Sequence, residues 1–202
     1  MNRAILTSIL FALVCYLVVY SRTTIGEHHA VATLNSDTVT GLVRFQQIGD
    51  VLQIKILANL LNTDGVKTKH GLHVHTFGDV STGCTSTGAH YDGGGKSHTH
   101  GSLTSLTAER HDGDLGNVEG NEQGVIEHNI ILSVNRQRLS INPCSVHSII
   151  GRAIVIHAHM DDLGLSNDVE SNISGNSGKR IACAVIGLAP GLASGLDRVD
   201  DM

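Results

Sequence analysis

The sequence has no excess of basic residues, because its 14 Lys and Arg are outnumbered by 19 Asp and Glu. The formal net charge of −5 therefore provides no general basic surface for nucleic acid. Aromatic residues make up only 3% of the chain, and Trp is absent. With 41% hydrophobic residues and 23 Gly in 202 residues, the composition favours one compact β-rich domain with many turns over a disordered chain.

Short alternating or apolar segments predict eight strands, and convincing helical periodicity is lacking outside the N-terminal segment. The predicted strands cover residues 30–34, 38–46, 51–60, 70–75, 116–118, 124–131, 152–158 and 181–188. Two long stretches rich in Gly and polar residues, 78–114 and 161–179, separate the later strands. Loops of this length in a compact domain need a function or something that pins them. The pattern predicts an antiparallel sandwich or barrel with two long functional loops.

The N-terminus has the character of a targeting segment. Arg3 precedes an almost wholly apolar run from Ile5 to Tyr20, which is shorter than a typical membrane span of about 20 residues. Ser21 offers a small residue for cleavage. We therefore expect a signal peptide over 1–21, a polar lead-in over 22–29, a domain over 30–189 and a flexible tail over 190–202. An uncleaved membrane anchor is the alternative, and both interpretations place the domain in an oxidising compartment outside the cell.

The cysteines leave an odd number once the targeting segment is set aside. Cys15 lies in that segment, which leaves Cys84, Cys144 and Cys183. In a secreted protein we expect one pair to be bridged. The third cysteine is then either a buried, inert thiol or a link to a second chain.

The strongest functional signal is a pair of histidines, His73 and His75, on a predicted strand. Residues two apart on a strand point to the same face, so the two imidazoles lie side by side and can hold one metal ion. Further candidate ligands follow along the chain: His90, His98, His111, Asp114 and, far downstream, His157. Imidazoles combined with one carboxylate suit a copper ion and a zinc ion.

Seven segments between about Ala30 and Ala189 resemble the copper/zinc superoxide dismutases, in particular their secreted members. The matching segments are GLHVHTFGD (71–79), GCTSTGAH (83–90), RHDGDLGN (110–117), IIGR (149–152), VIH (155–157), DDLG (161–164) and GNSGKRIAC (175–183). Motifs of this length and order are specific. The resemblance implies an all-β, eight-stranded Greek-key sandwich or barrel of immunoglobulin-like type, assembled as a homodimer.

The same resemblance implies the ligands of one copper and one zinc ion per chain. The copper ligands would be His73, His75, His90 and His157. The zinc ligands would be His90, His98, His111 and Asp114, so that His90 serves both ions. His98 keeps the usual distance from His90 and is preferred, whereas His100, which is followed by Gly101, is the alternative.

Further roles also come from the resemblance. Asp161 matches a carboxylate that accepts hydrogen bonds from one copper ligand and one zinc ligand and so fixes their orientation. Arg180 matches an arginine beside the copper. Cys84 and Cys183 match an intrasubunit disulfide, which leaves Cys144 as the spare thiol.

The implied activity is the conversion of superoxide into oxygen and hydrogen peroxide by copper redox cycling, with Arg180 and His90 as catalytic residues. Superoxide and a second copy of the chain are the expected partners, with neither nucleic acid nor, after cleavage, a membrane. A catalytically inactive copper-binding or copper-delivery protein is the alternative. It is disfavoured because every copper ligand is present and a Cys-x-x-Cys motif is absent. A structural sandwich or metal buffer would need neither Arg180 nor a shared histidine.

One further motif lies in the second long stretch. Asn172, Ile173 and Ser174 form an acceptor triplet for N-glycosylation, which is a surface modification of secreted proteins. Bare triplets often remain unused. A glycan at Asn172 would stand near the rim of the expected copper channel.

Overall fold

The structure is a computed structural model that describes residues 26–61, 65, 67–93, 100–103 and 110–191. The expected signal peptide, most of the expected tail and His98 lie outside these residues. Within the described part of the chain, no helix has the length and apolar character needed to cross a bilayer.

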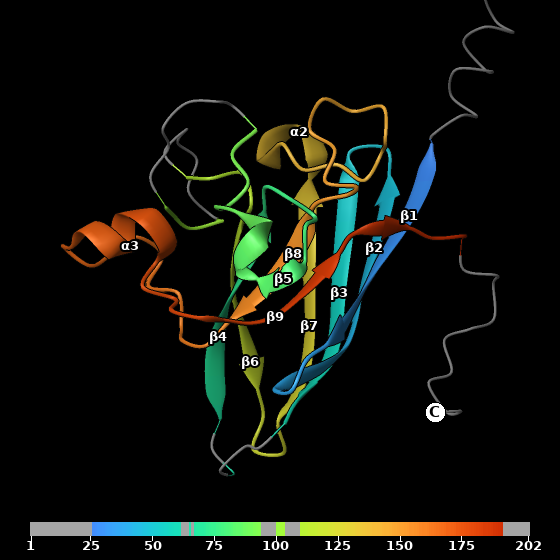
Figure 1. Ribbon diagram of the computed structural model, residues 1–202. Helices are drawn as coiled ribbons and strands as arrows, with labels where there is room; N and C mark the ends of the chain where they lie inside the picture. Colours follow the sequence, from blue (N-terminus) through green and yellow to red (C-terminus); the bar gives the residue numbers. More distant parts are fainter. Residues whose placement is uncertain (1–25, 62–64, 66, 94–99, 104–109, 192–202) are drawn as a thin grey trace, which may run out of the picture.

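The described residues form one antiparallel sheet of nine strands in the order β10-β1-β2-β3-β7-β6-β4-β8-β9. Strand β1, which is next to the end strand β10, also lies against β9 at the opposite end, so the sheet curls into a nearly closed barrel (Figure 1). The strands of the sheet are β1 (Glu27–Asn35), β2 (Val39–Ile48), β3 (Val51–Leu60), β4 (Thr68–His75), β6 (Asp114–Gly120), β7 (Val125–Ser133), β8 (Ala153–His157), β9 (Arg180–Val185) and β10 (Gly187–Leu188). The predicted all-β sandwich or barrel is therefore confirmed.

All eight predicted strands are present, and the differences lie at their ends. Strand β1 begins at Glu27, which pairs with Ile48 on β2, so the last three residues of the expected lead-in are part of the sheet. The last predicted strand divides into β9 and β10, and β10 pairs with β1. A short strand outside the sheet, β5 (Ser81–Cys84), was missed; it lies in the first long loop.

The core fills the inside of the barrel, as the alternation on β3 illustrates. Leu52, Ile54 and Ile56 are fully buried, whereas the residues between them face outward. Successive side chains on a strand point to opposite faces, so alternation of this kind gives one wall of the core. On β2, Phe45 is buried among the same cluster.

Three short helical elements were not predicted: η1 (Thr85–Thr87), α2 (Val134–Gln137) and α3 (Val169–Ser174). Helix α3 stands away from the strands at one side of the molecule (Figure 1). Its first turn is capped by Asp168, which accepts a 2.8 Å hydrogen bond from the Ser171 amide, and it ends at Gly175 with a φ of 64°. A six-residue helix is too short to show a periodic apolar pattern. The N-cap carboxylate and the glycine in a left-handed conformation are its remaining sequence signals.

Candidate metal centre

The barrel positions the first histidines by strand alternation. On β4, Leu72 and Val74 enter the core, so His73 and His75 lie on the opposite face, with ring centroids 6.4 Å apart. His157 is the last residue of the neighbouring strand β8. His90, from the first long loop, joins them through an isolated bridge to His75. All four side chains are buried.

These four histidines form one group of potential metal ligands, with one nitrogen of each within 4.8 Å of the others. Nδ1 of His75 hydrogen-bonds to the Gly88 carbonyl at 2.9 Å, and Nδ1 of His157 to the Gly178 carbonyl at 3.0 Å. A carbonyl can only accept, so both rings carry their proton on Nδ1 and keep the Nε2 lone pair. The two Nε2 atoms lie 3.3 Å apart, which suits ligation of one ion.

His73 faces the same place with its other nitrogen. Its Nε2 lies 2.9 Å from Oδ2 of Asp161, whereas its Nδ1 is buried without a hydrogen-bond partner. An unpaired buried nitrogen is costly unless something else satisfies it. A copper ion held by these imidazoles would supply the missing partner.

A second group surrounds Asp114, which is fully buried at the start of β6. Its carboxylate oxygens lie 2.8 Å from Nδ1 of His90, 3.1 Å from Nδ1 of His100 and 3.4 Å from Nδ1 of His111. Three imidazole nitrogens and one carboxylate are a typical tetrahedral zinc set. The chain thus offers one site that suits copper and a neighbouring site that suits zinc.

His73, His90, His100 and Asp114 form a group whose ligand atoms all lie within 4.8 Å of one another. We nevertheless assign His111 rather than His73 to this site. The free Nδ1 of His73 belongs with the first group, and Nδ1 of His111 is itself buried without a hydrogen-bond partner.

The zinc-ligand prediction for His98 lies outside the described residues and stays a prediction. His100, the alternative, is buried beside Asp114, and its Nε2 lies 2.7 Å from Oδ1 of Asp161. Its main-chain amide donates to the Asn172 carbonyl at 2.8 Å. Gly175 completes this pocket, since a Cβ there would collide with both the Asp161 carboxylate and the His100 ring.

His90 is the centre of the arrangement. Its ring centroid lies between 3.9 and 5.8 Å from those of five other histidines. Its Nδ1 faces Asp114, which leaves its Nε2 as the nitrogen for the first group. His90 can therefore serve both groups, each with a different ring nitrogen.

Burial sets the protonation of the first group. Desolvation, followed by the charge of His90, lowers the pKa of His73 to about 3 and that of His75 to about 2. Desolvation also lowers the pKa of His157 to about 4. Near neutral pH these imidazoles are uncharged, and the neutral form is the one that binds a metal ion.

In the second group the carboxylates determine which side chains are charged. Desolvation opposes charge on His100, but hydrogen bonds to Asp114 and Asp161 outweigh it and raise the His100 pKa to about 9. Desolvation would also raise the Asp161 pKa, yet the hydrogen bonds with His100 and His73 lower it to about 2. The pKa of Asp114 is likewise held well below its ordinary value by its histidine neighbours. Both carboxylates are therefore ionised and draw positive charge to this site.

Arg180 lines an open pocket of about 540 Å³ together with Lys179 and Gly178. Gly178 also accepts the hydrogen bond from His157, so the pocket adjoins the first histidine group. The guanidinium of Arg180 donates to the carbonyls of Cys84 at 2.8 Å and Gly88 at 2.6 Å, which fixes its position. A fixed cation beside the copper ligands suits a small anion.

The disulfide between Cys84 and Cys183 is present, with a Cα–Cα distance of 5.6 Å. It ties the first long loop to β9, and the Cys84 carbonyl binds Arg180. Cys144 is an exposed free thiol, so of the two alternatives for this cysteine the buried, inert thiol is wrong.

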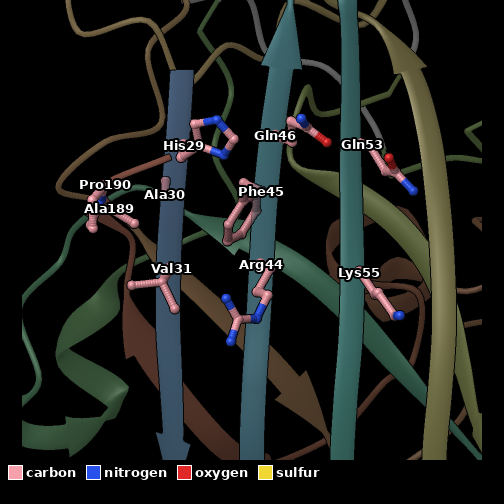
Figure 2. A pocket seen from close by; sticks show the side chains of 10 residues that line it. All are labelled: His29, Ala30, Val31, Arg44, Phe45, Gln46, Gln53, Lys55, Ala189 and Pro190. Carbon is pink, nitrogen blue, oxygen red and sulfur yellow. The ribbon is translucent and has the colours of Figure 1, made fainter. Parts of the chain in front are cut away.

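A separate cavity of about 230 Å³ lies on the outer face of β1, β2 and β3 (Figure 2). Arg44, Gln46, Gln53 and Lys55 are among the side chains around it. None of its lining residues belongs to either ligand group. Among the described residues, both ligand groups therefore lie away from this cavity, around β4 and β8.

The comparisons with known proteins agree with this geometry. The family model described as "Copper/zinc superoxide dismutase (SODC)" matches residues 39–186. A protein of Schizosaccharomyces pombe named "Superoxide dismutase [Cu-Zn]" is 45% identical over 161 residues, which cover 79% of this chain and 97% of the yeast protein. A protein of the same name from Kluyveromyces lactis is 40% identical over 162 residues, covering 80% and 97%.

A solved structure adds the three-dimensional likeness. The crystal structure of the clock protein EA4 superimposes with a TM-score of 0.70 at 34% identity, covering 81% of this chain and 96% of that protein. The fold and the two ligand groups define a β-barrel metalloprotein with a histidine-rich site for two metal ions. The chain belongs to the copper/zinc superoxide dismutase family, whose copper and zinc cofactors fit its two ligand groups.

Proposed function

We propose that this chain is an active superoxide dismutase that protects the space outside the cell. The single observation that carries the activity is His90, which faces the copper-type group with one ring nitrogen and Asp114 of the zinc-type group with the other. Family membership and the names of the relatives support it. The reaction consumes two superoxide anions and two protons and yields oxygen and hydrogen peroxide.

Copper, when bound, supplies the one-electron redox chemistry, and zinc supplies a fixed charge. The residues of the chain bind the anion, deliver a proton and orient the ligands. Arg180 draws the anion towards His157 and His75 and holds it beside them. His90 is the group placed to hold and deliver a proton, because its two ring nitrogens face the two ligand groups. Asp161 keeps the His73 and His100 rings in their orientations.

A His157→Ala change tests the activity. We expect copper content and superoxide consumption to fall to background, because the first group loses a ligand that also borders the anion pocket. His128→Ala is the matched control, since His128 is half-buried on β7 and belongs to neither group. Copper analysis and a superoxide assay on the purified protein provide the measurement. A copper-loaded wild type without activity would instead favour the copper-binding or copper-delivery alternative.

We also propose His100 as the third zinc ligand in place of His98. His100→Ala should lose most of its zinc while keeping its copper, because only the Asp114 group is broken. His98→Ala should keep both metals. Metal analysis by mass spectrometry after dialysis against a weak chelator separates the two, and the reverse pattern would restore His98.

A homodimer is proposed through an apolar surface formed by Phe77, Val80, Val185 and Leu188, which are 58%, 42%, 39% and 59% exposed. Two of the segments lie side by side, since Gly78, which follows Phe77, packs against Gly151 and Val185. Exposed apolar groups gathered in one place are typical of an interface. Ile149 and Ile186, which lie in neighbouring segments, are fully buried and do not contribute to this surface.

Phe77→Asp should convert the dimer into a monomer, because a carboxylate would be buried without a partner. Val125→Asp, at a 41% exposed position on β7, is the control and should leave the mass unchanged. Light scattering across a range of concentrations measures the result. A wild type that is monomeric throughout would contradict the proposal.

Secretion is proposed from the sequence of the first 21 residues and is compatible with the disulfide. Expression of the full chain in a eukaryotic host, with N-terminal sequencing of protein from the medium, tests it. A mature N-terminus just after Ser21 is expected. Retention of the full-length chain in the membrane fraction would favour the uncleaved anchor.

A further inference from the structure

The second long loop carries an apolar surface that the enzymatic chemistry does not use. Leu165, Val169 and Ile173 are 82%, 75% and 57% exposed. Single exposed apolar residues are ordinary, but three on one short loop form a surface that invites association. Val169 and Ile173 are four residues apart on α3 and so share one face of that helix.

Asn172 lies on the same helix, three residues after Val169 and directly before Ile173. It is exposed, and its side-chain nitrogen donates a 3.2 Å hydrogen bond to the Asp168 carbonyl. Its main-chain carbonyl, a separate group from the side-chain amide, accepts a 2.8 Å hydrogen bond from the His100 amide. A group attached to the Asn172 side chain therefore extends into solvent beside the apolar residues without disturbing the contact with His100.

We propose that Asn172 carries an N-linked glycan that covers the apolar face of α3. Asn172-Ile173-Ser174 is the only acceptor triplet in the whole sequence. A sugar ring has an apolar face of its own, so the first residues of a glycan can pack on Val169 and Ile173. The inference rests on the secretion proposed above, because the transfer occurs in the secretory pathway.

The transfer requires a lipid-diphosphate-linked oligosaccharide as the donor. The Asn172 Nδ2 forms a bond to the anomeric carbon of the first sugar, and the bond from that carbon to the diphosphate oxygen breaks. The diphosphate leaves with the electron pair, and the amide nitrogen loses one proton. In the folded chain the Ser174 hydroxyl is already bound to Glu170, so the triplet is modified before α3 forms.

The test uses the full chain and a second version in which residues 1–21 are replaced by a leader known to direct secretion in the same eukaryotic host. Protein from the medium is treated with peptide-N-glycosidase and analysed by mass spectrometry. We expect a loss of mass and conversion of Asn172 to aspartate. Asn172→Gln and Ser174→Ala should abolish the shift, whereas Ser174→Thr and Asn167→Gln should keep it.

The two proposals fail in different ways. If the leader-swapped protein reaches the medium with an unmodified Asn172, the glycan is excluded while secretion and activity stand. If only the leader-swapped protein is secreted and modified, the native leader fails while the glycan site stands. Enzymatic removal of the glycan should increase retention on a hydrophobic interaction column, and unchanged retention would overturn the covering role.

Discussion

Replacing Asp161 with alanine is expected to weaken the binding of both metal ions, by about 10- to 100-fold for each. Asp161 is 1% exposed and holds one ligand of each group, with Oδ2 2.9 Å from Nε2 of His73 and Oδ1 2.7 Å from Nε2 of His100. Without it, both rings lose the acceptor that fixes their tautomer and orientation. Neither ring is then held with an unprotonated Nδ1 directed at its metal ion.

Competition titrations with chelators of known affinity, performed separately for copper and zinc, measure the effect. Asp162→Ala is the control, because Asp162 bonds Ser171 and Asn176 within the second loop and touches neither histidine. Asp161→Asn should fall between the wild type and Asp161→Ala. Its amide keeps the shape but offers an N–H to one of the two rings, so only one can remain a donor. Unchanged affinities in Asp161→Ala would show that the ions alone orient their ligands.

The strands and the pairing of His73 with His75 could be predicted from the sequence because their signals are local, whereas the ligand set of each metal ion was implied by the resemblance. The His73-Val74-His75 alternation places both imidazoles on one face of β4 wherever the strand pairs. The barrel follows from the same period-two pattern repeated along the chain. Local patterns carry less information at strand ends, because pairing with the neighbouring strand determines where a strand begins. Glu27 belongs to β1 because it pairs with Ile48 on β2.

The choice between His98 and His100 as a zinc ligand could not be made from local sequence patterns. The preference for His98 rests on its sequence distance from His90. Such a count assumes that this loop follows the same path as in other family members, and glycine permits other backbone paths. The position of His100 is instead set by long-range contacts with Asp114, Asp161 and the Asn172 carbonyl. The adjacent Gly101, whose amide donates to the Asp114 carboxylate at 3.2 Å, supports the proposed assignment of His100.

Removing the disulfide is expected to destabilise the domain by about 2–5 kcal/mol. A double Cys84→Ser, Cys183→Ser variant avoids leaving either cysteine of the bridge as an unpaired thiol. The bridge spans 99 residues of sequence and attaches the first long loop to β9. Breaking it gives the unfolded chain more conformational freedom and releases the loop from β9 in the folded state. Chemical denaturation monitored by circular dichroism measures the change.

The same variant should lose activity beyond what its stability predicts. Cys84 and Gly88 supply carbonyls that hold Arg180, and His75 is anchored to the Gly88 carbonyl. A released loop therefore misplaces both the anion-binding cation and one copper ligand. Cys144→Ser is the control, because that exposed thiol should change the unfolding free energy by less than about 0.5 kcal/mol. Equal stability and equal superoxide consumption in the double variant and the control would show that the loop holds its position without the bridge.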